Sequence, residues 1–314
     1  MSPTPGEKLA NLRSRLSVPA ICAPMFLVSG PELVAAACRA GVIGAFPFPN
    51  ARTLETLETW LATLTEQITA NPKAAPFAAN LTTHRTYDRL EAEIALIAKY
   101  QPEVVITALG GPAPVLDTVH SYGGIVIADV STIPLARKAV ARGVDGLALV
   151  SAGAGGHTGS LNGLAFVTAV REFFDGIVVL AGGIGNGAGI RAAEVAGADL
   201  AYLGTRFIVA DESLASDEYR DMVVAATPDD LVATDRISGA LAYYLRASLE
   251  KMGVDPDNPG SGSGFDLSAS QDKIKAWRDV WSAGHGVGSV TRREPAGAIV
   301  AQLEAEYAAA AERA

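Results

Sequence analysis

Eight short apolar runs recur along the chain, and a turn and a helix-like stretch follow each of them. Successive runs begin about twenty to thirty-five residues apart, which is the spacing that parallel strands joined by helices require. The predicted strands are AICAPM (20–25), VIGAF (42–46), FAANL (77–81), VVITAL (104–109), IVIADV (125–130), LALVS (147–151), IVVLAGG (177–183) and LAYLGTRF (200–207). Eight strand–helix units predict an α/β fold of the closed (β/α)8 TIM barrel type.

Three of the predicted helices end in one common pattern, in which a glycine stands shortly before the next strand. These glycines are Gly41, Gly143 and Gly197. Helices commonly end on a left-handed residue, and glycine adopts that conformation without a steric penalty. We therefore expect a positive φ at all three positions.

The pattern changes after the eighth predicted strand. Residues 213–274 contain no strand-like run, so they predict a helical insertion or lid. Residues 275–314 predict C-terminal helices that return to the barrel, beginning with an amphipathic helix in which Trp277 and Trp281 are packing residues. Residues 1–212 would then form the barrel itself.

Composition and charge narrow the class of protein. Apolar residues make up 49% of the 314 residues and charged residues 19%, which is enough apolar material for a large core. The formal net charge of −9, without a dense run of Lys and Arg, argues against binding nucleic acid or an anionic membrane surface. A phosphate ligand would therefore be held mainly by backbone N–H groups.

The two cysteines, Cys22 and Cys38, are too few for a disulfide scaffold or a cysteine-only zinc site. The N-terminus lacks the apolar core of a signal peptide, and no uninterrupted apolar stretch is long enough to span a bilayer. We expect a cytoplasmic location, and the oligomeric state stays open.

In a TIM barrel the active site lies at the carboxyl ends of the strands. The seventh and eighth predicted strands end in Gly182-Gly183 and Gly204-Thr205. Glycine lets backbone N–H groups approach an anion, and barrels often bind phosphate at this place. The alternative is that these glycines only form tight turns. We favour a phosphate site because both strands have them.

A glycine-rich segment, SAGAGGHTG (151–159), follows the sixth predicted strand and brings His157 to the same end of the barrel. Imidazole acts as a base or a hydrogen-bond donor near neutral pH. His157 is therefore the catalytic candidate, and the alternative is that it only orders its loop. A second histidine, His285, reaches the pocket if the C-terminal segment folds back.

The lysines avoid every predicted strand end, which argues against Schiff-base chemistry, and no His, Asp and Glu cluster has the spacing of metal ligands. A barrel with a phosphate site and one histidine predicts that a bound cofactor carries the chemistry.

Five motifs together resemble the nitronate monooxygenase family, formerly called 2-nitropropane dioxygenases. They are APM at the first strand, AANL at the third, AGGH after the sixth, AGGI at the seventh and LGTRF at the eighth. The similarity extends from about residue 18 to WSAGHGVGSV (281–290), nearly the whole chain. It implies FMN-dependent oxidation of alkyl nitronates with molecular oxygen, hence a small-molecule substrate.

The resemblance also implies roles for residues. His157 matches the family's active-site histidine, acting as a base or as a positive partner for the nitronate anion. The glycines at the seventh and eighth strands would hold the FMN phosphate, and the ends of the first and third strands would lie near the flavin ring. The implied FMN-binding residues are Ala23, Pro24, Met25, Asn80, Asp129, Gly155, Gly156, Gly182, Gly183, Gly204 and Thr205.

Asp129 departs from the pattern of some relatives, which carry a lysine near the flavin at this position. A carboxylate there disfavours negative charge on the flavin unless it is protonated or hydrogen-bonded, which leaves the substrate open. Within 213–274, Tyr243 and Tyr244 are candidates either for the pocket or for packing between helices.

Two other functions stay open at this point. The same flavin would serve a reductase that passes hydride from NAD(P)H to a quinone or an enoyl thioester. A barrel that binds a phosphorylated metabolite without turnover is the alternative outside the enzymes.

Overall fold

The computed structural model describes residues 4–259 and 277–312. Within these ranges eight parallel strands close into a barrel. The barrel strands are β1 (Ala20–Cys22), β2 (Ile43–Pro47), β3 (Phe77–Thr82), β4 (Val104–Ala108), β5 (Ile125–Val130), β6 (Gly146–Val150), β8 (Ile177–Ala181) and β9 (Leu200–Leu203). Each strand overlaps one of the eight apolar runs, so the predicted TIM barrel is confirmed.

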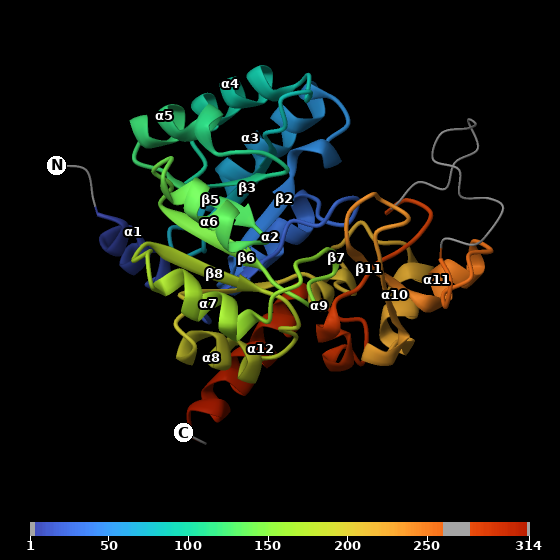
Figure 1. Ribbon diagram of the computed structural model, residues 1–314. Helices are drawn as coiled ribbons and strands as arrows, with labels where there is room; N and C mark the ends of the chain where they lie inside the picture. The colour runs from blue at the N-terminus through green and yellow to red at the C-terminus, as the bar shows by residue number, and fades with distance from the viewer. Residues whose placement is uncertain (1–3, 260–276, 313–314) are drawn as a thin grey trace.

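Helices cover the outside of this barrel (Figure 1). The connecting helices are α2 (Pro31–Ala40), α3 (Leu54–Ala70), α4 (Leu90–Tyr100), α5 (Ala113–Ser121), α6 (Ile133–Val140), α7 (Gly163–Arg171), α8 (Gly187–Val195) and the single turn α9 (Thr205–Ile208); a 3-10 turn, η1 (Phe48–Asn50), follows β2. Gly41, Gly143 and Gly197 have φ values of 94°, 88° and 105°, as predicted for helix ends.

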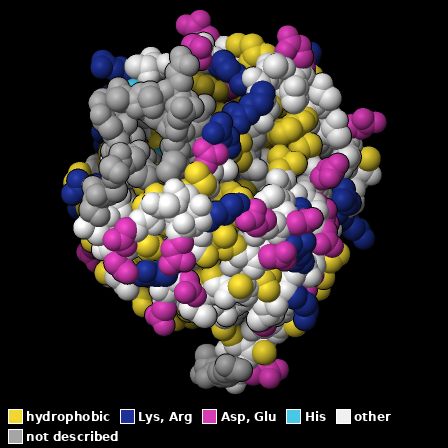
Figure 2. Space-filling view, turned by 90° about the vertical axis from the view of Figure 1, so that its right-hand side faces the viewer, with side chains coloured by type: hydrophobic (Ala, Val, Ile, Leu, Met, Phe, Trp, Pro, Cys, Tyr) yellow, Lys and Arg dark blue, Asp and Glu magenta, His cyan; other side chains and the backbone are white. Residues whose placement is uncertain are grey.

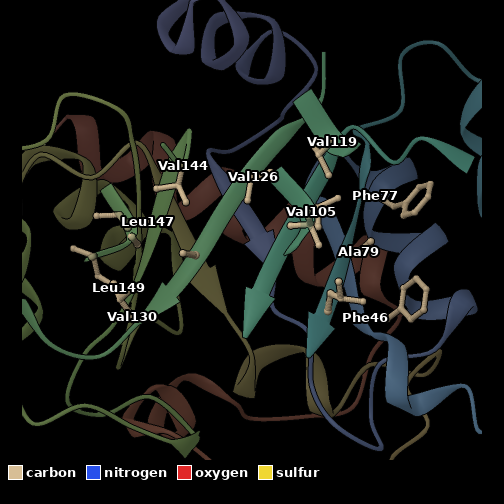
Figure 3. Packing of buried hydrophobic residues seen from close by; sticks show 14 of the residues in the cluster. Phe46, Phe77, Ala79, Val105, Val119, Val126, Val130, Val144, Leu147 and Leu149 are labelled. Carbon is tan, nitrogen blue, oxygen red and sulfur yellow. The ribbon is translucent and has the colours of Figure 1, made fainter. Parts of the chain in front are cut away.

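Apolar residues line both faces of the barrel wall. Because side chains alternate along a strand, Val126 and Val130 of β5 face the outer helices while Ile125 and Ile127 face the barrel interior. The outer layer between strands and helices includes Phe46 of β2, as Figure 3 shows. This alternation fixes which residues at the strand ends face inward.

Helix α1 (Pro5–Arg13) closes the amino-terminal end of the barrel. Its Leu12 is fully buried in one cluster with the inward-facing Ile21 and Ile177. Burying such a side chain contributes about 1.5–3 kcal/mol. The opposite end, where the strands finish, is therefore the end available for a ligand.

The C-terminal helix α12 (Ala296–Ala311) packs between α8 and α2 and takes the place of an eighth barrel helix, since α9 is only one turn long (Figure 1). Contact with α8 is close, because a Cβ added to Gly187 would lie 2.2 Å from the carbonyl oxygen of Leu303. The C-terminal part of the chain thus returns to the barrel as a helix at α12, as predicted.

The segment after β9 contains the predicted helices and also two short strands, so the expectation that it holds no strand is wrong. Its elements are α10 (Asp217–Ala225), the 3-10 turn η2 (Pro228–Asp230), β10 (Leu231–Thr234), β11 (Ala242–Leu245) and α11 (Arg246–Lys251). Strand β11 pairs antiparallel with β10 and with the two-residue strand β7 (Gly156–His157). Runs of four residues carry too little pattern to be recognised, and their stability comes from distant partners.

Residues 277–284 are not helical, in contrast to the amphipathic helix expected there; the first residues of that expected helix lie outside the described ranges. The backbone of Trp281 bonds instead to the inserted segment, accepting from Leu245 N and donating to Ser248 Oγ. A 3-10 turn, η3 (His285–Ser289), follows.

Charged side chains of both signs are interspersed on the face that Figure 2 shows. In the part of the chain that the structure describes, no helix is long and apolar enough to cross a membrane.

Candidate active site at the barrel mouth

The loops after β6, β8 and β9 meet the C-terminal segment at the carboxyl ends of the strands, a region we call the barrel mouth. The carbonyl oxygen of Gly153 accepts hydrogen bonds from Gly183 N at 3.2 Å and from His285 N at 2.9 Å. Gly284 N donates to Thr205 Oγ1 at 2.8 Å. Three glycine-rich strand ends and the segment around His285 therefore form one hydrogen-bonded unit.

Gly182 and Gly183 both have positive φ, 128° and 71°, which side chains rarely tolerate. A Cβ on Gly182 would also lie 2.1 Å from Ser151 Oγ, so only glycine fits between the ends of β6 and β8. A Cβ on Gly183 would lie 3.6 Å from His285 Cβ. The N–H of Gly183 already donates a hydrogen bond to the carbonyl oxygen of Gly153. Gly183 therefore shapes the barrel mouth through its missing side chain rather than through its N–H.

Gly204 and Thr205 lie where β9 ends. A Cβ added at Gly204 would lie in ordinary van der Waals contact with Met25 Sδ at 3.5 Å and Ala23 Cβ at 3.8 Å, so there is room for one methyl group between this backbone and the loop after β1. Thr205 is buried, and its oxygen accepts from Gly284 N. The hydroxyl proton of Thr205 can still donate to an anion.

The loop after β1 holds Ala23, Pro24 and Met25, which are all partly exposed. Asn50 fixes this loop, since its side chain donates to Met25 O at 3.0 Å and accepts from Leu27 N at 2.9 Å. Leu27 has a φ of 64°, a conformation that costs about 1–3 kcal/mol and persists only where its surroundings hold it. The Asn50 contacts supply that support.

Asn80 and Asp129 face the barrel interior at the ends of β3 and β5. Asn80 is buried, and its Nδ2 reaches the carbonyl oxygen of Ile106 at 3.4 Å. The Oδ1 atom of Asp129 is enclosed and has no hydrogen-bond partner among the described residues, and burial raises the pKa of this carboxyl to about 7.

Tyr202 of β9 is a mouth residue that sequence reasoning missed. It is buried in the barrel-interior cluster, and its hydroxyl also has no partner among the described residues. The sequence did offer a signal for it, because Tyr202 lies two residues after Leu200 on β9 and therefore shares its inward-facing side.

His157 lies on β7, opposite Ala242 of β11. Its partly exposed imidazole meets the ring of Trp277 edge to face, with centroids 5.3 Å apart, and Trp277 stacks on Tyr244 with centroids 5.3 Å apart. Partial enclosure lowers the pKa of His157. Trp277 is thus both a packing residue and a neighbour of the catalytic candidate, whereas Trp281 stacks on Tyr219.

Tyr243 points to the other face of the same small sheet, because neighbouring residues on a strand alternate. It lies opposite Gly156, and its ring meets that of His285 with centroids 4.7 Å apart. Gly155 packs closely against the same C-terminal segment, since a Cβ there would lie 2.7 Å from Gly284 N. The C-terminal segment thus does fold back, and His285 reaches the barrel mouth.

The described residues contain no group of three or more His, Cys, Asp or Glu side chains placed to hold a metal ion. The mouth brings together glycine-rich strand ends, two imidazoles and three inward-facing polar groups, which are Asn80, Asp129 and Tyr202.

Residues 11–255 of the chain match the protein family described as nitronate monooxygenase. A nitronate monooxygenase of Paraburkholderia phytofirmans is 29% identical, with 92% of each chain covered. A nitroalkane oxidase structure from Streptomyces ansochromogenes is 26% identical, with a TM-score of 0.79 and coverage of 98% of this chain and 99% of that one.

The structure of FabK from Thermotoga maritima has the same TM-score of 0.79 at 23% identity, covering 98% of this chain and 97% of that one, and shows a shared fold. The family match covers most of the chain and includes the strand ends that build the mouth from β1 to β9. The chain therefore belongs to the nitronate monooxygenase family and is an oxidoreductase.

Proposed function

We propose that the protein oxidises alkyl nitronates, the anions of nitroalkanes, with molecular oxygen, using FMN bound at the barrel mouth. One observation carries this proposal: in a chain of this family, hydrogen bonds connect the glycine-rich ends of β8 and β9 to the segment around His285. The similarity to a nitroalkane oxidase over nearly the full length of both chains supports the substrate class.

The residues at the ends of β8 and β9 fit a phosphate group. Gly182 and Gly183 keep side chains away from the cradle, Gly204 leaves space beside its backbone, and Thr205 has a hydroxyl proton to donate. Phosphate at this position of a barrel follows the common pattern. The described residues around it suit a single phosphate, which favours FMN.

The ring of the cofactor would lie over the inward-facing residues of the mouth. Ala23, Pro24 and Met25 offer a partly exposed, largely apolar edge next to Gly204, and Asn80 and Asp129 offer polar groups from β3 and β5. Gly155 and Gly156 would border it from the loop after β6. Bound there, FMN would accept electrons from the nitronate and pass them to oxygen.

His157 would act on the substrate. Because enclosure lowers its pKa, the imidazole is mainly neutral at neutral pH. A neutral ring can take the acidic carbon-bound proton from a nitroalkane or donate a hydrogen bond to the oxygen of a preformed nitronate. Trp277 would hold the ring in place through their edge-to-face contact.

The two buried free thiols, Cys22 and Cys38, fit the reducing cytoplasm expected from the sequence.

Two measurements on the purified protein test the proposal. Mass spectrometry of the released cofactor should find FMN, and ethylnitronate alone should drive oxygen consumption. Recovery of FAD, or of no flavin after attempted reconstitution, would contradict the cofactor assignment. Oxygen consumption that requires NADH or NADPH would favour a reductase instead.

A further inference from the structure

Two polar groups face the interior of the barrel mouth without partners. Asp129 continues the inward-facing side of β5 after Ile125 and Ile127, and Figure 3 shows Val126 and Val130 on the opposite, outer side. Tyr202 continues the inward-facing side of β9. Asp129 Oδ1 and the Tyr202 hydroxyl are both enclosed and unpartnered among the described residues.

Unpartnered buried polar atoms are uncommon in native proteins, and each costs about 1–3 kcal/mol. Tyr202 is 8% exposed, so water reaches it little. Asp129 is the fifth of the six residues of β5 and Tyr202 the third of the four residues of β9, so both lie in the half of the barrel toward the carboxyl ends of the strands. A bound ligand that accepts hydrogen bonds would satisfy both.

The surroundings of Asp129 favour its neutral form. Its neighbour in register on β6 is Ala148, and burial is what raises the pKa of Asp129 to about 7. Burial first, and then the negative charges of Asp129 and Cys22, raise the pKa of the Tyr202 phenol.

Other charged or ionisable groups lie on the helix that covers β5 and on the loops at the barrel mouth. On α6, which covers β5, Arg137 is engaged with the ring of Phe173 outside the barrel, at 3.9 Å, and Lys138 is exposed. Above the mouth, the loops contribute His157, Tyr243 and His285. Asp129 thus has no partner that would hold it as a carboxylate among the described residues.

We propose that a neutral Asp129 carboxyl and the Tyr202 hydroxyl form a hydrogen-bond-donating floor for the carbonyl-bearing edge of the FMN ring. The inference rests on the proposed function, because it assigns these two residues to the proposed cofactor. In this arrangement a proton, rather than a fixed cation, compensates negative charge on the ring. Above the Asp129 pKa of about 7, where the group is still a carboxylate, it takes this proton from solvent as the ring is reduced; the electrons come from the substrate or, in the test, from dithionite.

The test measures the midpoint potential of the flavin bound to the holoprotein between about pH 6 and pH 8, the range around the Asp129 pKa. The wild-type potential should fall more steeply with pH than that of Asp129→Asn, which keeps the shape and a donor but cannot titrate. Asp117→Asn is the matched control, since it removes an exposed carboxylate from α5. Its slope should equal that of the wild type.

Tyr202→Phe should keep the wild-type slope but weaken FMN binding about 2- to 12-fold, the effect of one net hydrogen bond. Carbon-13 NMR of the Asp129 carboxyl, assigned by comparison with Asp129→Asn, should show titration near pH 7 in the protein as purified. This readout does not depend on turnover.

Equal slopes in wild type and Asp129→Asn, with flavin bound to both, would overturn this inference alone. A carboxyl that titrates at the ordinary pH of an aspartate would do the same. A wild-type protein that binds no flavin would overturn the proposed function together with the inference.

Discussion

The backbone N–H of Gly284 donates a hydrogen bond of 2.8 Å to the Thr205 hydroxyl, which ties the C-terminal segment to the end of β9. Thr205→Val should therefore loosen the segment around His285 and weaken FMN binding together. Leaving the buried Gly284 N–H without a partner costs about 1–3 kcal/mol of folding free energy.

Chemical denaturation and flavin titration check this prediction. Thr205→Ser should restore both properties. Thr63→Val is the control, because the Thr63 hydroxyl is exposed on α3 and donates only to the preceding turn. Unchanged stability and unchanged FMN affinity in Thr205→Val would show that the hydrogen bond has neither role.

Gly204→Ala should fold normally but bind FMN more weakly. An added Cβ would meet no protein atom closer than 3.5 Å, so it would occupy the space that the proposed phosphate needs. Gly182→Ala, by contrast, should destabilise the fold, since its Cβ would lie 2.1 Å from Ser151 Oγ. Gly297→Ala, on the exposed side of α12, is the control.

Flavin content and circular dichroism separate these variants. Full flavin occupancy in Gly204→Ala would place the phosphate elsewhere.

Glu294 should stabilise the protein through its buried ion pair with Arg206, whose side chain is 3% exposed. Glu294→Ala leaves that guanidinium without its partner, so we expect a loss of about 3–5 kcal/mol in unfolding free energy. Glu218→Ala removes an exposed pair with Lys251 and should cost about 0–1 kcal/mol. Equal losses in urea unfolding would contradict the assignment.

The same pair predicts a pH dependence. Burial alone would raise the pKa of Glu294, but hydrogen bonds from Arg206 and Arg292 and their positive charges hold it below its usual value. A carboxyl with a lowered folded-state pKa contributes stability above its unfolded pKa, about 4.3, and loses it as the pH falls further. Urea unfolding of wild type and Glu294→Ala should therefore converge in acid, and a constant difference would contradict this.

The barrel could be predicted from the sequence because its signals are local. Each strand is a continuous apolar run, and Gly41, Gly143 and Gly197 mark helix ends by their own conformational freedom. The strands β10 and β11 could not be predicted, because four residues carry little periodicity and their pairing with β7 joins segments more than 70 residues apart.

The candidate site shows the same division. The glycines of the cradle follow strands directly, so their meeting at one end was predictable. Contact between His285 and Tyr243 depends on the path of the C-terminal segment, which no local pattern encodes. Tyr202 was missed because a tyrosine inside an apolar run resembles core, and only closure of the barrel places its hydroxyl near Asp129.

The two imidazoles should separate by role. His157→Ala should keep FMN and lose about 10²–10⁴-fold in kcat/KM, the usual contribution of acid–base catalysis. His285→Ala should mainly weaken FMN binding, because His285 lies against Gly183. Steady-state kinetics and flavin titration compare the two variants. Near wild-type rates in His157→Ala, together with a large loss of rate in His285→Ala, would assign the catalytic role to His285 instead.

The substrate distinguishes how His157 acts. If the imidazole removes a proton, the defect of His157→Ala should be much larger with neutral nitroethane than with ethylnitronate. If it orients the anion by a hydrogen bond, both substrates should suffer equally.

Anaerobic stopped-flow mixing of the flavin-loaded protein with ethylnitronate tests the central claim most directly. The account predicts that ethylnitronate, without NADH or NADPH, changes the visible absorbance of the flavin rapidly, and that admitting oxygen restores it. A flavin spectrum that ethylnitronate leaves unchanged, while NADH or NADPH bleaches it, would contradict nitronate oxidation and assign the barrel to a reductase.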